Sequence, residues 1–172
     1  MKLRKTVLLA LLTAAALGLF SVELLIPPFP LCPAAKIGLA NTVTLFMLSK
    51  GKIFTPADCF LVLVARCLIS ALVTGRLMSV LFSFCGGFLA LAAMLIARKF
   101  FGSGIVAISI IGAVFHNIGQ TLAGIFFYGV FSVLYMLPAF FAAGILSGTV
   151  TGLCIFLINK NKSLEKFLQN YR

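Results

Sequence analysis

Long apolar runs with almost no charged residues constrain this chain more than any other feature. The clearest run is residues 104–128, which contain no Asp, Glu, Lys or Arg. A run of about 20 apolar residues is enough to cross a bilayer as a helix. Only helices and closed barrels span lipid, and barrel strands would give short segments of alternating hydrophobicity instead. The sequence therefore predicts an all-α integral membrane protein.

Composition agrees with this prediction and leaves little room for anything else. The chain has 172 residues, of which 62% are hydrophobic and 10% are charged, and its mean hydropathy is +1.20. Soluble domains are nearer to half apolar and a quarter charged. No stretch is long and polar enough to form a separate soluble domain. Residues 1–172 are therefore predicted to form a single membrane domain.

The apolar runs predict a bundle of six transmembrane helices. The first run ends at the segment "PPFPLCP", because proline supplies no amide donor to a helix. Thr55, Pro56 and Asp58 mark a helix start, as cap, first-turn residue and charge near the positive end of the dipole. Asp58 is thus interpreted as a capping residue, not a site residue. The predicted helices cover residues 6–26, 34–48, 57–73, 77–97, 104–128 and 132–158, with a cytoplasmic tail at 159–172.

The basic residues predict the orientation in the membrane, because cytoplasmic loops are rich in lysine and arginine. With the N-terminus inside, cytoplasmic segments hold eleven of the fourteen basic residues. Both termini are therefore expected on the cytoplasmic side of a bacterial cytoplasmic membrane. The net charge of +11 is then a topology signal, and no nucleic-acid partner is expected. The N-terminus is not interpreted as a cleaved signal, because its apolar run continues past "TAAA" to Ile26.

The segment "GAVFHNIGQ" places three polar residues, including the only histidine, inside an apolar run. By depth, the polar residues of the predicted spans lie from the middle of the membrane outwards. Such groups are costly in lipid, so they are expected to face the bundle interior. Together they predict a polar cavity open to the outside. Its candidate substrate-binding residues are Glu23, Lys36, Asn41, Arg66, Arg76, His116, Asn117 and Gln120.

Charge in this cavity favours an anionic ligand, because three basic residues accompany Glu23 alone. Structural roles stay open for each member. His116, Asn41 and Asn117 can form interhelical hydrogen bonds, and Arg66 can pair with Glu23. Lys36 and Arg76 can be anchors at the membrane interface. The five cysteines show no C-x-x-C pair and no metal-ligand spacing, so no metal or cofactor is expected.

Small residues mark a second surface on the first helix. Ala10, Ala14 and Gly18 recur at four-residue spacing, which lets another helix approach closely. The stripe is open to two interpretations, packing within the bundle or docking of a partner protein.

Three segments resemble a known family. "KIGLANTVTLFML" (36–48), "SVLFSFCGGFLALAAM" (79–94) and "GAVFHNIGQ" (112–120) resemble the Gx transporters, also labelled heptaprenyl diphosphate synthase component I. That family is similar to the substrate-binding S components of energy-coupling-factor (ECF) transporters. The resemblance implies a six-helix bundle that captures a vitamin-like molecule from outside. It also implies that Ala10, Ala14 and Gly18 dock onto a transmembrane coupling subunit driven by ATPases.

The sequence predicts that the chain is not an enzyme. Prenyl diphosphate synthases hold magnesium with aspartate-rich motifs, whereas this chain has one aspartate, Asp58. It also lacks the phosphate-binding loop of an ATPase. The function expected is capture of a small anionic nutrient, such as a flavin, a quinone precursor or another vitamin-like molecule, for ATP-driven uptake. The alternative is a non-catalytic accessory protein in isoprenoid-quinone synthesis or in flavin-linked membrane redox chemistry.

Overall fold

The computed structural model describes residues 2–25, 38–75, 77–102, 104–129, 131–161 and 163–164, and this part of the chain is all-helical. Each of the six predicted spans contains a helix. The elements are α1 (Lys2–Leu25), α2 (Asn41–Ser49), α3 (Pro56–Thr74), α4 (Leu77–Phe101), α5 (Ile105–Tyr128), the 3-10 helix η1 (Phe131–Met136) and α6 (Leu137–Asn159). Of the predicted cytoplasmic tail, residues 162 and 165–172 lie outside the described residues, and Leu164 packs against the apolar core.

The second predicted span needs correction. Five of the described helices are long and apolar enough to cross a membrane, but α2 has only nine residues. At about 1.5 Å per residue, it covers roughly 13 Å, less than half of the hydrocarbon core. The prediction of a helix over residues 34–48 was therefore wrong in length within the described part, and residues 34–37 lie outside it. By helix length and hydropathy the chain is a multi-pass membrane protein, and its described residues form five helices long enough to span a membrane, with α2 too short to do so.

Local sequence explains where α3 begins. The Thr55 hydroxyl accepts a hydrogen bond from the Asp58 backbone N–H, and the Asp58 carboxylate accepts one from the Thr55 backbone N–H at 2.7 Å. This reciprocal pair satisfies amides that the first turn leaves without partners. Lys5 of α1 adds an ion pair to Asp58, at 2.7 Å. The capping role predicted for Asp58 is therefore confirmed.

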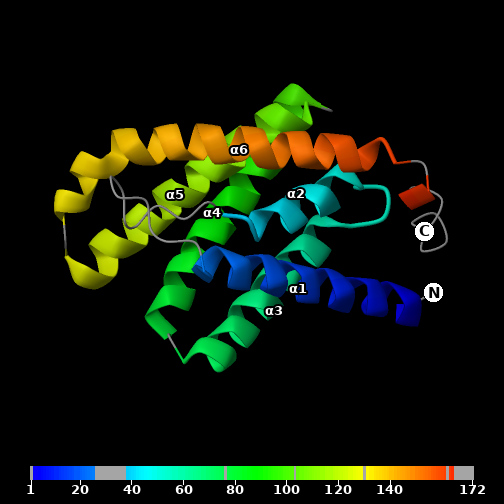
Figure 1. The fold of residues 1–172 in the computed structure, drawn as a ribbon, viewed down its shortest axis with the longest axis horizontal. Helices are drawn as coiled ribbons and strands as arrows, with labels where there is room; N and C mark the ends of the chain where they lie inside the picture. The colour runs from blue at the N-terminus through cyan, green and yellow to red at the C-terminus, as the bar shows by residue number, and fades with distance from the viewer. Residues whose placement is uncertain are drawn as a thin grey trace.

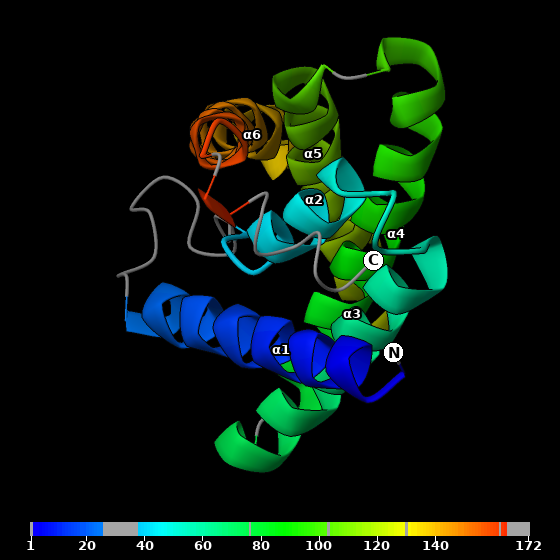
Figure 2. The same ribbon diagram turned by 90° about the vertical axis from the view of Figure 1, so that its right-hand side faces the viewer.

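The short helix α2 lies at the centre of the bundle. It contacts α1, α3, α4, α5 and α6, and Figure 2 shows it between α1 and α6. In Figure 1, α1 and α6 run in opposite directions, and the N-terminus and the end of α6 lie at the same end of the molecule. The end of α2 lies there too, since Ser49 is 3.4 Å from the side chain of Asn159.

Glycines bring α4, α5 and α6 into close contact. A Cβ at Gly148 of α6 would lie 2.6 Å from the Cα of Ile110, and one at Gly119 of α5 would lie 2.7 Å from the carbonyl oxygen of Cys85. Real Cβ atoms do not approach so closely, so these positions require glycine. Ser109 and Thr151 share a hydrogen bond of 2.9 Å across the α5–α6 contact. Small residues and buried hydroxyl pairs commonly hold membrane helices together in this way.

Apolar and polar side chains separate along the bundle. The main apolar cluster takes the first half of α1, α3 and α5 and the last half of α4 and α6. Representative members are Leu8, Cys59, Met94, Ile108 and Ile155. Ser109 and Thr151 are buried polar residues at the level of this cluster. On α3 and α5, Arg66, His116 and Gln120 lie about two turns or more beyond Cys59 and Ile108, which places these three farther from the start of α1 and the end of α6.

Candidate functional site

The only histidine is held inside the bundle by its own helix and by α4. His116 and Gln120 are 4% and 8% exposed, and their side chains are joined by a hydrogen bond of 3.0 Å between His116 Nε2 and Gln120 Nε2. Which of the two side chains donates depends on the tautomer of the His116 ring and on the orientation of the Gln120 amide. A Cβ at Gly86 of α4 would lie 2.9 Å from both side chains. Gly86 therefore leaves the room that the pair occupies.

The entry to α2 reaches the same histidine. Gly38 adopts a positive φ of 74°, and its Cβ position lies 3.4 Å from Asn41 Nδ2 and 3.6 Å from His116 Cδ2. The Gly38 N–H donates to the carboxylate of Glu23 on α1. Glu23, Asn41, His116 and Gln120 therefore converge around Gly38 and Gly86.

Arg66 borders this group from α3. It is 5% exposed, and one of its guanidinium nitrogens lies 3.4 Å from the Cβ position of Gly87. Gly86 and Gly87 are consecutive, so Arg66 and His116 contact adjacent sides of one turn of α4. The group Glu23, Asn41, Arg66, His116 and Gln120 is called the polar layer below.

The Arg66 guanidinium has little to satisfy it within the described part of the chain. Its hydrogen bond there goes from Nη2 to Cys67 Sγ, at 3.8 Å, and no carboxylate of the described residues forms an ion pair with it. The predicted alternative of a pair with Glu23 is therefore not formed. Burying a charge without a counter-charge costs several kcal/mol. This buried cation is the strongest indication of an anionic ligand.

Asn117 points elsewhere. Its Nδ2 donates to the backbone carbonyl of Phe140 in α6 at 3.0 Å. The backbone carbonyl of Asn117 accepts a hydrogen bond from the Thr121 hydroxyl. The side chain is 4% exposed and joins α5 to α6. This geometry matches the alternative role given above for Asn117, an interhelical hydrogen bond. Asn117 is therefore not part of the polar layer.

A space of about 10 Å³ lies beside Asn41 and is also lined by Thr42, Ser109 and Thr151. This is about the room that one water molecule needs. Asn41 Nδ2 and Thr42 Oγ1 are buried and have no hydrogen-bond partner among the described residues, so a water there would satisfy both. The larger outward cavity stays a prediction, because Lys36 and Arg76 lie outside the described residues.

The stripe on α1 faces away from the bundle. Ala10, Ala14 and Gly18 are all exposed, and a Cβ at Gly18 would meet no described atom within 4 Å. The buried side chains of α1 are on the other face, represented by Leu8, Ala16 and Phe20. Packing of the stripe against the described helices is therefore not observed.

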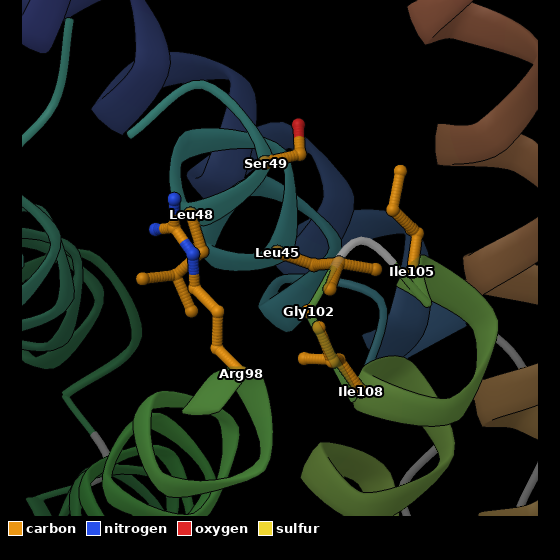
Figure 3. Close-up of a pocket in the computed structure, with 7 residues that line it drawn as sticks. All are labelled: Leu45, Leu48, Ser49, Arg98, Gly102, Ile105 and Ile108. Carbon is orange, nitrogen blue, oxygen red and sulfur yellow. The ribbon is translucent and has the colours of Figure 1, made fainter. Parts of the chain in front are cut away.

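Sequence reasoning interprets the glycines of "FSFCGGF" (82–88) as positions that permit close contacts or leave space for a ligand, but does not include them among the candidate site residues. Gly86 and Gly87 give the polar layer its space, and their adjacency in an apolar helix was the available signal. It also missed the contact of α6 with α5, although Gly144, Gly148 and Gly152 recur at four-residue spacing. A second cavity, of about 390 Å³, lies between the end of α2, the end of α4 and the start of α5 (Figure 3). No sequence motif indicated it.

The fold and the polar layer define a class: a small multi-pass membrane protein with a buried polar site and few carboxylates. Within that class the chain belongs to the heptaprenyl diphosphate synthase component I family, whose sequence model matches residues 12–157. This confirms the family resemblance. Neither the curated proteins nor the solved structures gave a match to the chain.

Proposed function

We propose that the chain is the membrane-embedded substrate-binding subunit of an ATP-driven uptake system, similar to an ECF S component. Its substrate is a small anionic nutrient, such as a flavin, a quinone precursor or another vitamin-like molecule. The polar layer holds the substrate, and partner subunits supply the coupling helix and the ATPases.

One observation carries this proposal: the buried guanidinium of Arg66, which has no counter-charge in the described part of the chain. Arginine presents a planar fork of donors that suits carboxylate and phosphate groups. An anionic substrate would supply the missing charge. Small-molecule sites are mostly apolar with a few placed polar groups, and Arg66, His116 and Gln120 in an apolar bundle fit that description.

The exposed stripe on α1 supports the partner part of the proposal. Ala10, Ala14 and Gly18 share one outward face, and small residues allow the backbone of a second helix to come near. A coupling subunit in the membrane is the partner that such a face would meet. The chain itself is proposed not to be an enzyme. It has three acidic residues, and the one aspartate is occupied by its cap and by Lys5.

The family name favours a second candidate, a non-catalytic accessory protein in isoprenoid-quinone synthesis. The two candidates differ in what they retain and whom they bind. A substrate-binding subunit should retain a small molecule and co-purify with a coupling subunit. An accessory protein should instead co-purify with a prenyl synthase or a redox protein. Mass spectrometry of the protein purified in mild detergent separates them.

An Arg66→Met variant tests the proposal without knowledge of the ligand. Removing an unpaired buried charge should raise the thermal stability of the ligand-free protein, by about 1 kcal/mol or more. The same change should remove the small molecule that co-purifies with the wild type. If Arg66 were a structural residue, the variant would be less stable than the wild type. That result, with the small molecule still retained, would refute the assignment.

A further inference from the structure

The cavity between the end of α2, the end of α4 and the start of α5 shares no lining residue with the polar layer. It has a volume of about 390 Å³, within the range of small-molecule sites. Its walls come from three helix ends: Leu45, Leu48 and Ser49 of α2, Arg98 of α4, and Ile105 and Ile108 of α5. Gly102 completes the lining. Four of these residues are aliphatic, so most of the wall suits a hydrocarbon chain.

One charged group stands at this apolar cavity. Figure 3 shows Arg98 reaching from α4 toward Leu48, with Ile105 and Ile108 on the α5 side. Within the described part of the chain, Arg98 is exposed and makes no hydrogen bond or ion pair. Of the two described carboxylates, Asp58 is paired with Lys5 and Glu23 accepts a hydrogen bond from Gly38. The Arg98 donors are therefore available to a ligand.

Backbone packing fixes where these donors lie. A Cβ at Gly51, in the turn between α2 and α3, would lie 2.9 Å from the Arg98 Cζ. The guanidinium thus rests against a residue without a side chain. Lys50 and Lys52 flank Gly51 in sequence, which makes this mouth of the cavity basic. Basic segments next to a membrane attract anionic head groups.

We propose that this cavity binds one amphiphile with a phosphate head group and a single hydrocarbon chain in contact with the protein. Arg98 binds the phosphate, and the wall of Leu45, Leu48, Ile105 and Ile108 takes the chain. The site is separate from the polar layer and goes beyond the uptake function. Two sources share this chemistry: an anionic phospholipid of the inner leaflet, or an isoprenoid phosphate.

The test uses the purified full-length protein, delipidated in a non-ionic detergent. Native mass spectrometry measures the binding of phosphatidylglycerol, farnesyl phosphate and phosphatidylcholine. One bound molecule of either anionic probe is expected, and which of the two is retained identifies the source. Arg98→Gln should weaken that binding at least about tenfold. Lys99→Gln removes the same charge at the adjacent position, and should change binding by no more than about twofold.

Two further variants separate the head-group contact from the chain contact. Gly51→Ala keeps every charge but displaces the Arg98 guanidinium, so it should also weaken binding. Ile105→Phe fills the cavity and should reduce binding, whereas Ile105→Leu keeps the volume and should preserve it. Failure of both anionic probes to bind would overturn the proposal. So would equal losses in Arg98→Gln and Lys99→Gln, phosphatidylcholine binding as tightly as phosphatidylglycerol, or full binding by Ile105→Phe.

Discussion

Asp58 and Arg66 show, at the scale of single residues, how surroundings decide what a charge does. Asp58 accepts hydrogen bonds from Thr55 and forms an ion pair with Lys5, so its negative charge is balanced within the fold. Arg66, two turns further along α3, is 5% exposed and bonds weakly to a sulfur. Both residues are charged and lie on one helix, but only Arg66 leaves a charge for another molecule to neutralise.

Gly86 is the residue on which the geometry of the polar layer depends most directly. In Gly86→Ala, the new Cβ would lie 2.9 Å from His116 and Gln120, and must push the pair away. We expect a loss of stability of about 1–3 kcal/mol, together with loss of the co-purified ligand. Thermal unfolding and mass spectrometry of the purified variant measure both.

The control for this change is Gly18→Ala, because a Cβ there meets nothing within 4 Å. Alanine favours the helix by about 0.5–1 kcal/mol over glycine, so this variant should be as stable as the wild type or more so. Equal stability of Gly86→Ala and Gly18→Ala would show that the His116–Gln120 pair does not depend on Gly86.

His116 and Asn117 are neighbours in sequence with different expected roles, which makes them a matched pair. His116→Ala should weaken ligand binding at least about tenfold, as expected when a charged ligand group loses one hydrogen-bond partner. Asn117→Ala breaks the bond to Phe140 and should cost about 1–3 kcal/mol of stability while leaving affinity unchanged. Equilibrium binding and thermal unfolding of both variants decide this. The opposite assignment of effects would exclude His116 from the site.

At the scale of whole elements, the positions of the helices along the chain could be predicted from the sequence. Whether each helix is long enough to cross the membrane could not always be predicted. The apolar runs gave α3, α4 and α5 within a few residues, since runs such as 104–128 have no alternative in lipid. The N-cap at Thr55 and the proline in the first turn of α3, Pro56, could also be recognised in the sequence. The length of α2 could not, because apolar residues before Asn41 extend the run although the helix begins only there. Periodicity alone does not separate a short buried helix from a span.

Part of the site was predictable for the same reason. Burial of Arg66, His116 and Gln120 follows from the cost of polar groups in lipid, and the helix rise places Arg66 and His116 at similar depth. The side of α5 on which Asn117 lies depends on how closely α6 packs, and that is set by Gly144 and Gly148 meeting the α5 backbone. The four-residue spacing of these glycines marks a face for close helix contact, but it does not say which helix packs there.

The outer face of α1 gives a prediction at the element scale. Ala14→Leu or Gly18→Leu places a bulky side chain on an exposed stripe, where it would block the approach of a second helix. Uptake by cells should therefore be abolished while ligand affinity of the purified protein stays unchanged. Ala15→Leu is the control, since Ala15 is exposed beside the stripe. Loss of ligand affinity in Ala14→Leu would mean that the stripe supports the fold instead.

For the whole molecule, the short α2 does not disturb the alternation of helix direction. The start of α1 meets the start of α3 through Lys5 and Asp58, and the end of α2 meets the end of α6 through Ser49 and Asn159. The start of α1 and the end of α6 therefore lie at one end of the bundle, as Figure 1 also shows. The polar layer lies toward the opposite end, where an uptake protein would meet its substrate.

Cysteine labelling tests this orientation in the membrane. In a background with all five native cysteines replaced by alanine, Phe131→Cys and Lys52→Cys each add one thiol at an exposed position. Because basic residues gather at the end that holds Lys52, that end should be cytoplasmic. A membrane-impermeant maleimide added to intact cells should then label Phe131→Cys and leave Lys52→Cys unlabelled until the cells are opened. The reverse pattern would place the polar layer toward the cytoplasm, and capture of a nutrient from outside would no longer be tenable.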